Sequence, residues 1–500
     1  MSKPIVNKHD DPPPYAAGAV AAVAALAGSV AALSAMRYGY YYDELYFIAA
    51  GKRPSLSYAD QGPLVPLLAF CMDWLFPGSF AALRIPAIIA ALVVVVFSAI
   101  IARELGGGRV AQVVAAIACS TAFGVLGEAA TLCTNGIDTA LWVLLSWLLV
   151  RWVRTRHDGL LLAAGLVTVA ALQVKWLVPV FWIAVLVAAG FVGPKDLLRR
   201  PALWWSALAV AVSATPALIW QARHGWPQVG MGAVVRDQTN MLYGSLTFTP
   251  RAVEMCGVLG AVLLVHGVWR LWRSPHLRPY KFLGLAFLVV VVVFAVTGGR
   301  IEYGAGIYPA VMAAGAVELA AMRSRWTAIA AVPAVVLSIA AFVVWATPWR
   351  SASQLTPARD FAAGLASRAY GEFGWSQLTS AVADAYRALP PEQRHSAVIV
   401  TETYVQASAL DYSRSAAGLP AIFSPMRGFG YFGAPPDTAT TVLWIGGDAS
   451  DLRIWFASVL SMAKVSVRLG MPLVTRDVTI WECAGPTQAW SSMWSRMRKL

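Results

Sequence analysis

Long apolar stretches separated by short polar links make up most of the first 350 residues, and they predict transmembrane helices. About eleven stretches approach the length that crosses a bilayer. They fall at 16–36, 82–102, 109–127, 138–151, 159–174, 176–192, 202–221, 252–269, 282–298, 305–322 and 326–346. The pair at 159–174 and 176–192 is short and is interrupted by Gln173, Lys175 and Pro179. The pattern predicts a polytopic α-helical membrane protein in which these two segments are tilted or partial helices.

The link between the first two apolar stretches, residues 37–81, predicts two short amphipathic helices. Pro63 suits the first turn of the second one. Apolar side chains then recur at helical spacing and form one face: Leu64, Leu67, Leu68, Cys71 and Leu75. This helix has about 13 residues before Pro77-Gly78, too few to span a bilayer. We expect it to lie along the membrane surface.

The composition changes after Thr347, where short β-prone runs alternate with helical ones. The β-prone runs are 397–401, 441–446, 463–468 and 478–483, and a helical run covers 404–414. This alternation predicts a small α/β domain. The predicted organisation is a cytoplasmic tail at 1–15, a membrane domain at 16–346 and an extracytoplasmic α/β domain at 347–500.

The distribution of basic residues predicts the orientation of the chain in the membrane. The chain has 39 Lys and Arg against 26 Asp and Glu, a net charge of +13, while 58% of its residues are hydrophobic. Its basic residues collect in links that fall on one side if the spans alternate, and that side is the cytoplasm. The N-terminus is then inside, and the links 37–81, 128–137, 222–251 and 299–304 are outside. No basic arm with interleaved aromatics is present, so the charge does not indicate nucleic acid. The expected location is the cytoplasmic membrane.

Acidic side chains stand out at the outer edge of the predicted bundle. Asp43 and Glu44 lie among tyrosines just after the first span, and Asp43 could act as a general base toward a hydroxyl. The same pair equally suits the solvated start of a helix, where acids favour the N-terminal dipole. Asp60 is also typical of a turn. Asp138 suits either a helix cap or an acid in a pocket shared with Asp43.

Cationic candidates lie near the same edge. Lys175 is costly between two apolar segments unless it reaches water, a partner or a phosphate. Arg84 and Arg300 suit either phosphate binding or extension to the membrane surface. His224 begins a long outer link, but no second His stands at metal-ligand spacing. The five cysteines show neither a CxxC pair nor metal-ligand spacing. The sequence assigns no cofactor, and it leaves open whether the protein binds a divalent metal ion.

Taken in order, several of these segments resemble a known family. They are Asp43-Glu44, Asp60-Gln-Gly-Pro-Leu-Val, Arg84-Ile-Pro, Asp138-Thr-Ala-Leu-Trp, Lys175, Ile219-Trp-Gln-Ala-Arg-His-Gly-Trp-Pro and Glu302-Tyr-Gly-Ala-Gly-Ile-Tyr-Pro. Over about the first 320 residues the chain resembles the protein O-mannosyltransferase and aminoarabinose transferase family of the GT-C superfamily, a glycosyltransferase family 39-like group. Residues 402–412 and 427–433 resemble the outer domain of its bacterial members.

The resemblance implies an enzyme that moves a sugar from a polyprenyl-phosphate donor to an acceptor outside the membrane, by inverting displacement. The acceptor could be a protein, a lipid or a wall glycan. By position, Asp43 would be the base, with Glu44 beside it and Asp138 as a second acid. The residues expected to bind substrate, including the departing phosphate, are Asp60, Gln61, Arg84, Lys175, His224, Arg300 and Tyr303.

Two positions depart from the family pattern. Many members read Asp-x-Pro-Pro-Leu, and the aminoarabinose branch has a Lys before Pro-Pro-Leu that is linked to the donor phosphate. This chain has Gln61 and Gly62 there, so the sugar stays open. Two other functions also stay open, a membrane transporter or lipid flippase and a non-catalytic GT-C-like binding subunit. Mid-membrane charges and repeated halves are typical of transporters, and neither is apparent.

Overall fold

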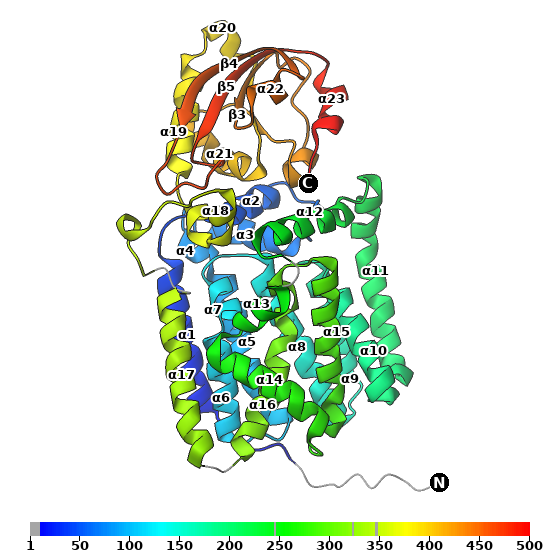
Figure 1. The fold of residues 1–500 in the computed structure, drawn as a ribbon. Coiled ribbons are helices and arrows are strands. Elements are labelled where there is room, and N and C mark those ends of the chain that lie inside the picture. The colour runs from blue at the N-terminus through cyan, green and yellow to red at the C-terminus, as the bar shows by residue number, and fades with distance from the viewer. Residues whose placement is uncertain (1–10, 245–246, 323–324, 346–348) are drawn as a thin grey trace.

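A computed structural model describes residues 11–244, 247–322, 325–345 and 349–500. It consists of a bundle of long helices and a smaller domain that contains all the described strands (Figure 1). Short helices lie between the two parts: α2 (Tyr42–Gly51), α3 (Leu64–Leu75), α4 (Phe80–Leu83), α12 (Pro227–Leu242) and α18 (Phe361–Ala366). We call the helical body the membrane domain and the body that contains the strands the outer domain.

Each of the predicted apolar stretches folds as a helix or as a bent pair of helices. They are α1 (Ala17–Ala35), α5 (Ile85–Glu104), α6 (Arg109–Ser120) with α7 (Phe123–Ala129), α8 (Thr134–Thr155), α9 (Gly159–Leu172), α10 (Val178–Val192), α11 (Pro201–Arg223), α13 (Phe248–Glu254) with α14 (Gly257–Arg273), α15 (Lys281–Thr297), α16 (Tyr308–Ala321) and α17 (Arg325–Trp345). Among the described residues, six helices are long and apolar enough to cross a membrane, or up to eight if each bent pair is one span. The fold class is confirmed, but by length and composition the count is lower than the predicted eleven. One reason is that α9 and α10 have only 14 and 15 residues.

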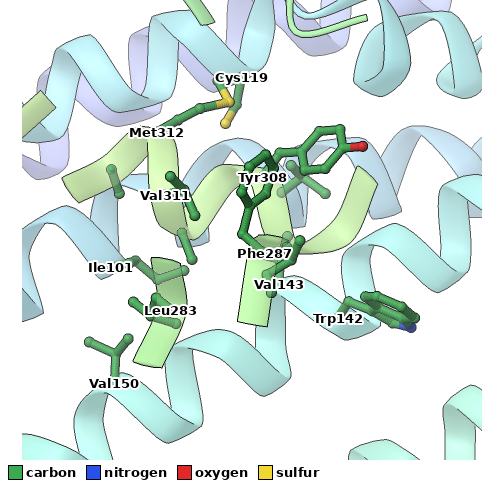
Figure 2. Packing of buried hydrophobic residues seen from close by; sticks show 14 of the residues in the cluster. Ile101, Cys119, Trp142, Val143, Val150, Leu283, Phe287, Tyr308, Val311 and Met312 are labelled. Atoms are coloured by element: carbon green, nitrogen blue, oxygen red, sulfur yellow. The ribbon is translucent and has the colours of Figure 1, made fainter. Parts of the chain in front are cut away.

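Small residues let the central helices approach closely. A Cβ added at Gly315 of α16 would lie 2.1 Å from the carbonyl oxygen of Leu263 on α14, and one at Gly267 would lie equally close to Val311. Such glycine contacts are typical of helix pairs in membranes, where apolar burial alone cannot drive association. Larger side chains fill the neighbouring space, and Figure 2 shows Tyr308 of α16 beside Phe287 of α15.

The helices between the bundle and the outer domain include both that were predicted in the first outer link. Pro63 stands immediately before α3. The buried side of α3 carries Val65 and Ala69, whereas Leu67 and Leu75 of the predicted apolar face are exposed. An exposed apolar face on a short helix beside a membrane domain is the arrangement expected of a helix lying on a bilayer surface.

The outer domain has a five-stranded sheet in the order β2-β1-β3-β5-β4. The strands are β1 (Ala397–Thr401), β2 (Ile422–Phe423), β3 (Thr441–Ile445), β4 (Phe456–Val465) and β5 (Val478–Pro486). β1 pairs in parallel with β2 and β3, while β5 is antiparallel to β3 and β4. Helices α19 (Trp375–Ala388), α21 (Tyr404–Ala417) and α23 (Trp490–Met497) pack around the sheet. The predicted α/β domain is confirmed, although β4 begins well before the predicted 463–468 and ends at Val465.

Candidate active site

A cavity of about 520 Å³ lies between the membrane domain and the outer domain. The membrane domain lines it from α2, from the loop before α3, from the link between α9 and α10, from α12 and from the segment after α15. The outer domain closes it with side chains from α18, from the start of α21 and from the segment after β2. Charged side chains from both domains line this cavity: Asp43, Asp60, Lys175, Arg236, Arg300 and Arg427.

Asp43 occupies the first turn of α2. The turn is fixed by a capping box, in which the backbone N–H of Tyr41 donates to the Glu44 carboxylate at 2.8 Å. The hydroxyl of Tyr404 from the outer domain donates to Asp43 Oδ1 at 2.9 Å. Burial raises the pKa of Asp43, and the charge of Arg427 and the Tyr404 hydrogen bond oppose this rise.

Asp60 approaches the same place from the loop before α3. It accepts a hydrogen bond from the hydroxyl of Tyr46 at 2.8 Å, and its other oxygen lies 3.8 Å from Arg427 Nη1. Burial raises the pKa of Asp60 as well, again opposed chiefly by Arg427. The charge of Arg427, which comes from the outer domain, therefore lowers the pKa of both carboxylates of the cavity.

Gly62 explains how this loop reaches the site. Its N–H donates to the Val174 carbonyl at 3.1 Å, and the N–H of Leu64 donates to the Gln173 carbonyl at 2.9 Å. A Cβ at position 62 would lie 2.2 Å from Gln173 O, so a side chain cannot enter without moving backbone. This close contact joins the loop that carries Asp60 and Gln61 to the link that carries Lys175.

The membrane-domain cations form a chain of contacts along one wall. Lys175 Nζ donates to Asn135 Oδ1 at 3.0 Å and lies 4.0 Å from the centre of the Tyr303 ring. Asn135 donates in turn to Glu302 at 3.3 Å, and Glu302 lies 3.9 Å from Arg300. The Arg300 side chain lines the cavity, and its Nε is buried without a partner in the described chain.

Two site residues were not predicted, and both come from the outer domain. Arg427 Nη1 donates to the Tyr404 hydroxyl at 3.0 Å, and the guanidinium lies 4.5 Å from the centre of the same ring. Both residues stand in segments that contributed to the family resemblance. No spacing in the sequence connects either with Asp43, which is hundreds of residues away, so only the fold brings them together.

Glu44 and Arg84 lie outside the residues that line the cavity, contrary to expectation. Arg84 Nε donates to Glu44 at 2.8 Å, and its Nη2 lies 3.3 Å from Glu372. The Arg84 side chain is 1% exposed and that of Glu44 is 0% exposed. Burial of both charges explains the difference, because Arg84 and Glu44 pair with each other in the interior and not at the cavity wall.

Asp138 and His224 also lie outside the cavity lining. Asp138 is buried in the first turns of α8, and its Oδ1 has no hydrogen-bond partner in the described chain. His224 stacks on Trp220 at 4.0 Å, with Nδ1 at 2.7 Å from the Trp220 carbonyl. The predicted residues that do meet in the cavity are Asp43, Asp60, Gln61, Lys175, Arg300 and Tyr303.

The cavity has an excess of positive charge, because its lining includes four basic side chains and two carboxylates. In the part of the chain that the structure describes, no three His, Cys, Asp or Glu side chains are grouped as a metal site. A cavity that contains a carboxylate and several cations is suited to a ligand that combines a hydroxyl with a phosphate group.

Comparisons with known proteins agree with the predicted resemblance. Residues 60–220 match the family model described as dolichyl-phosphate-mannose-protein mannosyltransferase. A search of curated protein sequences finds no match.

Among solved structures, ArnT from Cupriavidus metallidurans is similar in its complex with undecaprenyl phosphate, with 14% identity and a TM-score of 0.58. Its apo state gives 13% identity and a TM-score of 0.60. Each comparison covers 94% of this chain and 99% of ArnT. The arabinofuranosyltransferase AftD from Mycobacteria is also similar, with 11% identity, a TM-score of 0.51 and coverage of 94% of this chain and 40% of AftD.

The shared architecture extends over both parts of the molecule, because the ArnT comparison spans nearly the full length of both chains. The family model matches within the membrane domain, from the Asp60 loop to α11. Several helices are also long and apolar enough to cross a membrane. The chain is therefore a multi-pass membrane protein with the fold of the GT-C superfamily of glycosyltransferases, which confirms the predicted resemblance at that level.

Proposed function

We propose that the protein is a glycosyltransferase that moves a sugar from a polyprenyl-phosphate carrier to a hydroxyl of an extracytoplasmic acceptor. The observation that carries the proposal is that Asp43, Lys175 and Arg300 line the same cavity. A donor of this class has a phosphate on its anomeric carbon, so a base is needed on one face of the sugar and cations on the other. The undecaprenyl phosphate bound to the similar ArnT structure supports a carrier of this type.

The proposed reaction is a single inverting displacement. The acceptor oxygen forms a bond to the anomeric carbon while its proton passes to the Asp43 carboxylate. The bond between the anomeric carbon and the phosphate oxygen breaks, and its electron pair leaves with the phosphate. Lys175 and Arg300 stabilise the negative charge that grows on the leaving polyprenyl phosphate. Tyr303 and Gln61, which also line the cavity, contact the substrate.

The arrangement of the domains supports an active site at the outer membrane surface. The cavity lies at the end of the bundle that carries the outer domain (Figure 1). The basic links of the sequence assign the opposite end to the cytoplasm. The carrier lipid would then remain in the bilayer while its sugar reaches the cavity. The acceptor is a protein, a lipid or a wall glycan that is exposed on the outer side.

The test uses a strain that lacks the protein, complemented with the wild-type chain or with Asp43→Asn. The matched control is Asp384→Asn, since Asp384 is an exposed acid of the outer domain with a partner, Arg387, only three residues away. Lipid-linked sugars and envelope glycans are compared by mass spectrometry. We expect the Asp43→Asn strain to accumulate the same lipid-linked sugar as the deletion and to lack the same envelope sugar. The control is expected to match the wild type.

Restoration of the envelope sugar by Asp43→Asn, at wild-type expression, would overturn the role of Asp43 as base. A deletion strain with unchanged lipid-linked sugars and unchanged envelope glycans would overturn the proposed function as a whole. Thermal unfolding of each purified variant shows that the comparison is made between folded proteins.

A further inference from the structure

The outer domain reaches the acids of the cavity through two neighbouring parallel strands. Tyr404 is the first residue of α21 and follows β1, and Arg427 follows β2. Because β1 and β2 are parallel partners, their carboxyl ends lie at the same edge of the sheet. Helix α21, which follows β1, packs on α2 of the membrane domain (Figure 1). Ligands of open α/β sheets bind beyond the carboxyl ends of the strands, and here that edge closes the cavity.

The direction of the hydrogen bonds follows from the chemistry of the two side chains. A guanidinium can only donate, so the Tyr404 oxygen accepts from Arg427 at 3.0 Å. The hydrogen of the phenol is then directed to Asp43 Oδ1 at 2.9 Å. Within the described chain, Asp43 Oδ2 receives no hydrogen bond. One oxygen of the proposed base is thus held by the outer domain, and the other is left for a ligand.

Arg427 is held in place by unusual backbone geometry. Its φ of 47° is in the left-handed region, which residues with a side chain rarely adopt. Its N–H donates to the Lys499 carbonyl at 2.8 Å, and the N–H of Lys499 donates to Pro425 at 2.9 Å. The side chain is only 12% exposed, and its Nε has no partner in the described chain. The fold therefore directs this guanidinium into the cavity despite the strain.

We propose that Tyr404 and Arg427 are positioning residues for the reaction: Arg427 orients the Tyr404 hydroxyl, and this hydroxyl holds Asp43 so that Oδ2 faces the acceptor. The outer domain is then an essential part of the active site in addition to any role in acceptor binding. This inference rests on the proposed role of Asp43 and extends it to residues that are hundreds of positions away in sequence.

The pH dependence of transfer reports on this arrangement. The titratable and charged groups around Asp43 are its chain neighbours Tyr41 and Tyr42, and Asp60, Arg300, Tyr404 and Arg427. The charge of Arg427 and the hydrogen bond from Tyr404 lower the pKa of Asp43 against the effect of burial. Loss of either group raises this pKa, so the base becomes protonated at a higher pH. The acid limb of the pH–rate profile then moves to higher pH.

The experiment compares Tyr404→Phe and Arg427→Gln with Tyr412→Phe. Tyr412 lies two turns further along α21, and its hydroxyl also joins the two domains, through Tyr40 at 2.9 Å and Asp73 at 3.2 Å. It does not line the cavity. Turnover is measured as release of polyprenyl phosphate from the lipid-linked sugar purified from the deletion strain. Binding of that lipid is measured separately.

For Tyr404→Phe we expect the acid limb of the turnover profile to move to higher pH, so that turnover at a fixed pH on that limb falls, with donor binding unchanged. Arg427→Gln is expected to move the limb in the same direction, which keeps the test available if the first variant does not fold. Tyr412→Phe is expected to keep the wild-type profile.

A wild-type profile for Tyr404→Phe and Arg427→Gln, together with an inactive Asp43→Asn, would overturn the positioning role alone. An equal shift for Tyr412→Phe would also overturn it, because domain docking would then explain the effect. An active Asp43→Asn would overturn the proposed base, and the positioning role with it.

Discussion

The contact between Glu44 and Arg84 leads to a prediction that separates a structural role from a catalytic one. Arg84 also donates to the backbone carbonyls of Ala35 at 2.9 Å and Gly39 at 2.8 Å. It therefore ties the end of α1 and the start of α2 to the segment of the outer domain that carries Glu372. Replacement by Met in Arg84→Met removes the cation and leaves Glu44 buried without its partner.

The expected cost follows from the loss of that ion pair, because Glu44 then keeps only the backbone N–H donors of Tyr41 and Leu132. Loss of one partner of a fully buried ion pair costs about 3–5 kcal/mol, mainly because the remaining charge stays desolvated. We therefore expect the melting temperature of Arg84→Met in detergent to fall by several degrees. The double variant Glu44→Gln with Arg84→Met removes the stranded charge and should recover part of the loss. Thermal unfolding of the wild type, both single variants and the double variant forms a double-mutant cycle.

The opposite outcome is equally definite. If Arg84 binds the donor phosphate, Arg84→Met would weaken donor binding and leave the melting temperature unchanged. The double variant would then show no recovery. That result would refute the structural role of the pair and return both residues to the active site.

Three further predictions follow from particular contacts. Burial raises the pKa of Glu372 to about 8 from 4.5, so the folded state holds this proton more tightly than the unfolded state. Its contribution to stability is complete below pH 4.5 and is lost as the pH rises through 8. Glu372→Gln should flatten the fall in melting temperature between pH 5 and 9, and an unchanged pH dependence would contradict this. Gly62→Ala should reduce the unfolding free energy by about 1–3 kcal/mol through overpacking against Gln173, and it should impair transfer. Denaturant unfolding measures the first effect and turnover the second. A variant that is fully active and as stable as the wild type would contradict the close contact. Lys175→Met should weaken donor binding about 10- to 100-fold, as for loss of a charged hydrogen bond. Titration with the purified lipid-linked sugar measures the affinity. Unchanged affinity would show that Lys175 does not bind the phosphate.

The parts of the fold that depend on local periodicity were predictable from the sequence. Apolar stretches of bilayer length fold as helices in the bundle, and β1, β3 and β5 lie at or near the positions that their β-prone runs indicate. The number of spans was less predictable. Length alone does not show that a stretch such as 109–127 bends by 59° between α6 and α7.

The cavity residues that lie on the outer links were predictable from the sequence. Residues whose place in the fold depends on charge pairing were not. Asp43, Lys175 and Arg300 reach the cavity because the helix ends that carry them meet at one end of the bundle. Glu44 stands next to Asp43 in sequence, but on a helix adjacent residues point in different directions. It therefore meets Arg84 in the interior, and only the folded chain shows this.

Tyr404 and Arg427 illustrate the other limit. Their contact with Asp43 depends on how the outer domain docks on α2, and no periodicity or spacing in the chain encodes that docking. Gly62 is an intermediate case, since the departure from the family pattern was visible in the sequence. Its cause, the close approach to the Gln173 carbonyl, became visible only with the structure.

Turnover of the purified protein in lipid nanodiscs tests directly whether this chain transfers a sugar from a polyprenyl-phosphate donor. The donor is the lipid-linked sugar from the deletion strain, and delipidated envelope material from that strain supplies the acceptor. We predict that the wild-type protein releases one polyprenyl phosphate for each sugar transferred, and that Asp43→Asn releases none above background. Binding of the donor without release of polyprenyl phosphate would contradict it and indicate a binding subunit. Movement of the intact lipid-linked sugar across a vesicle membrane, without cleavage, would contradict it in favour of a transporter.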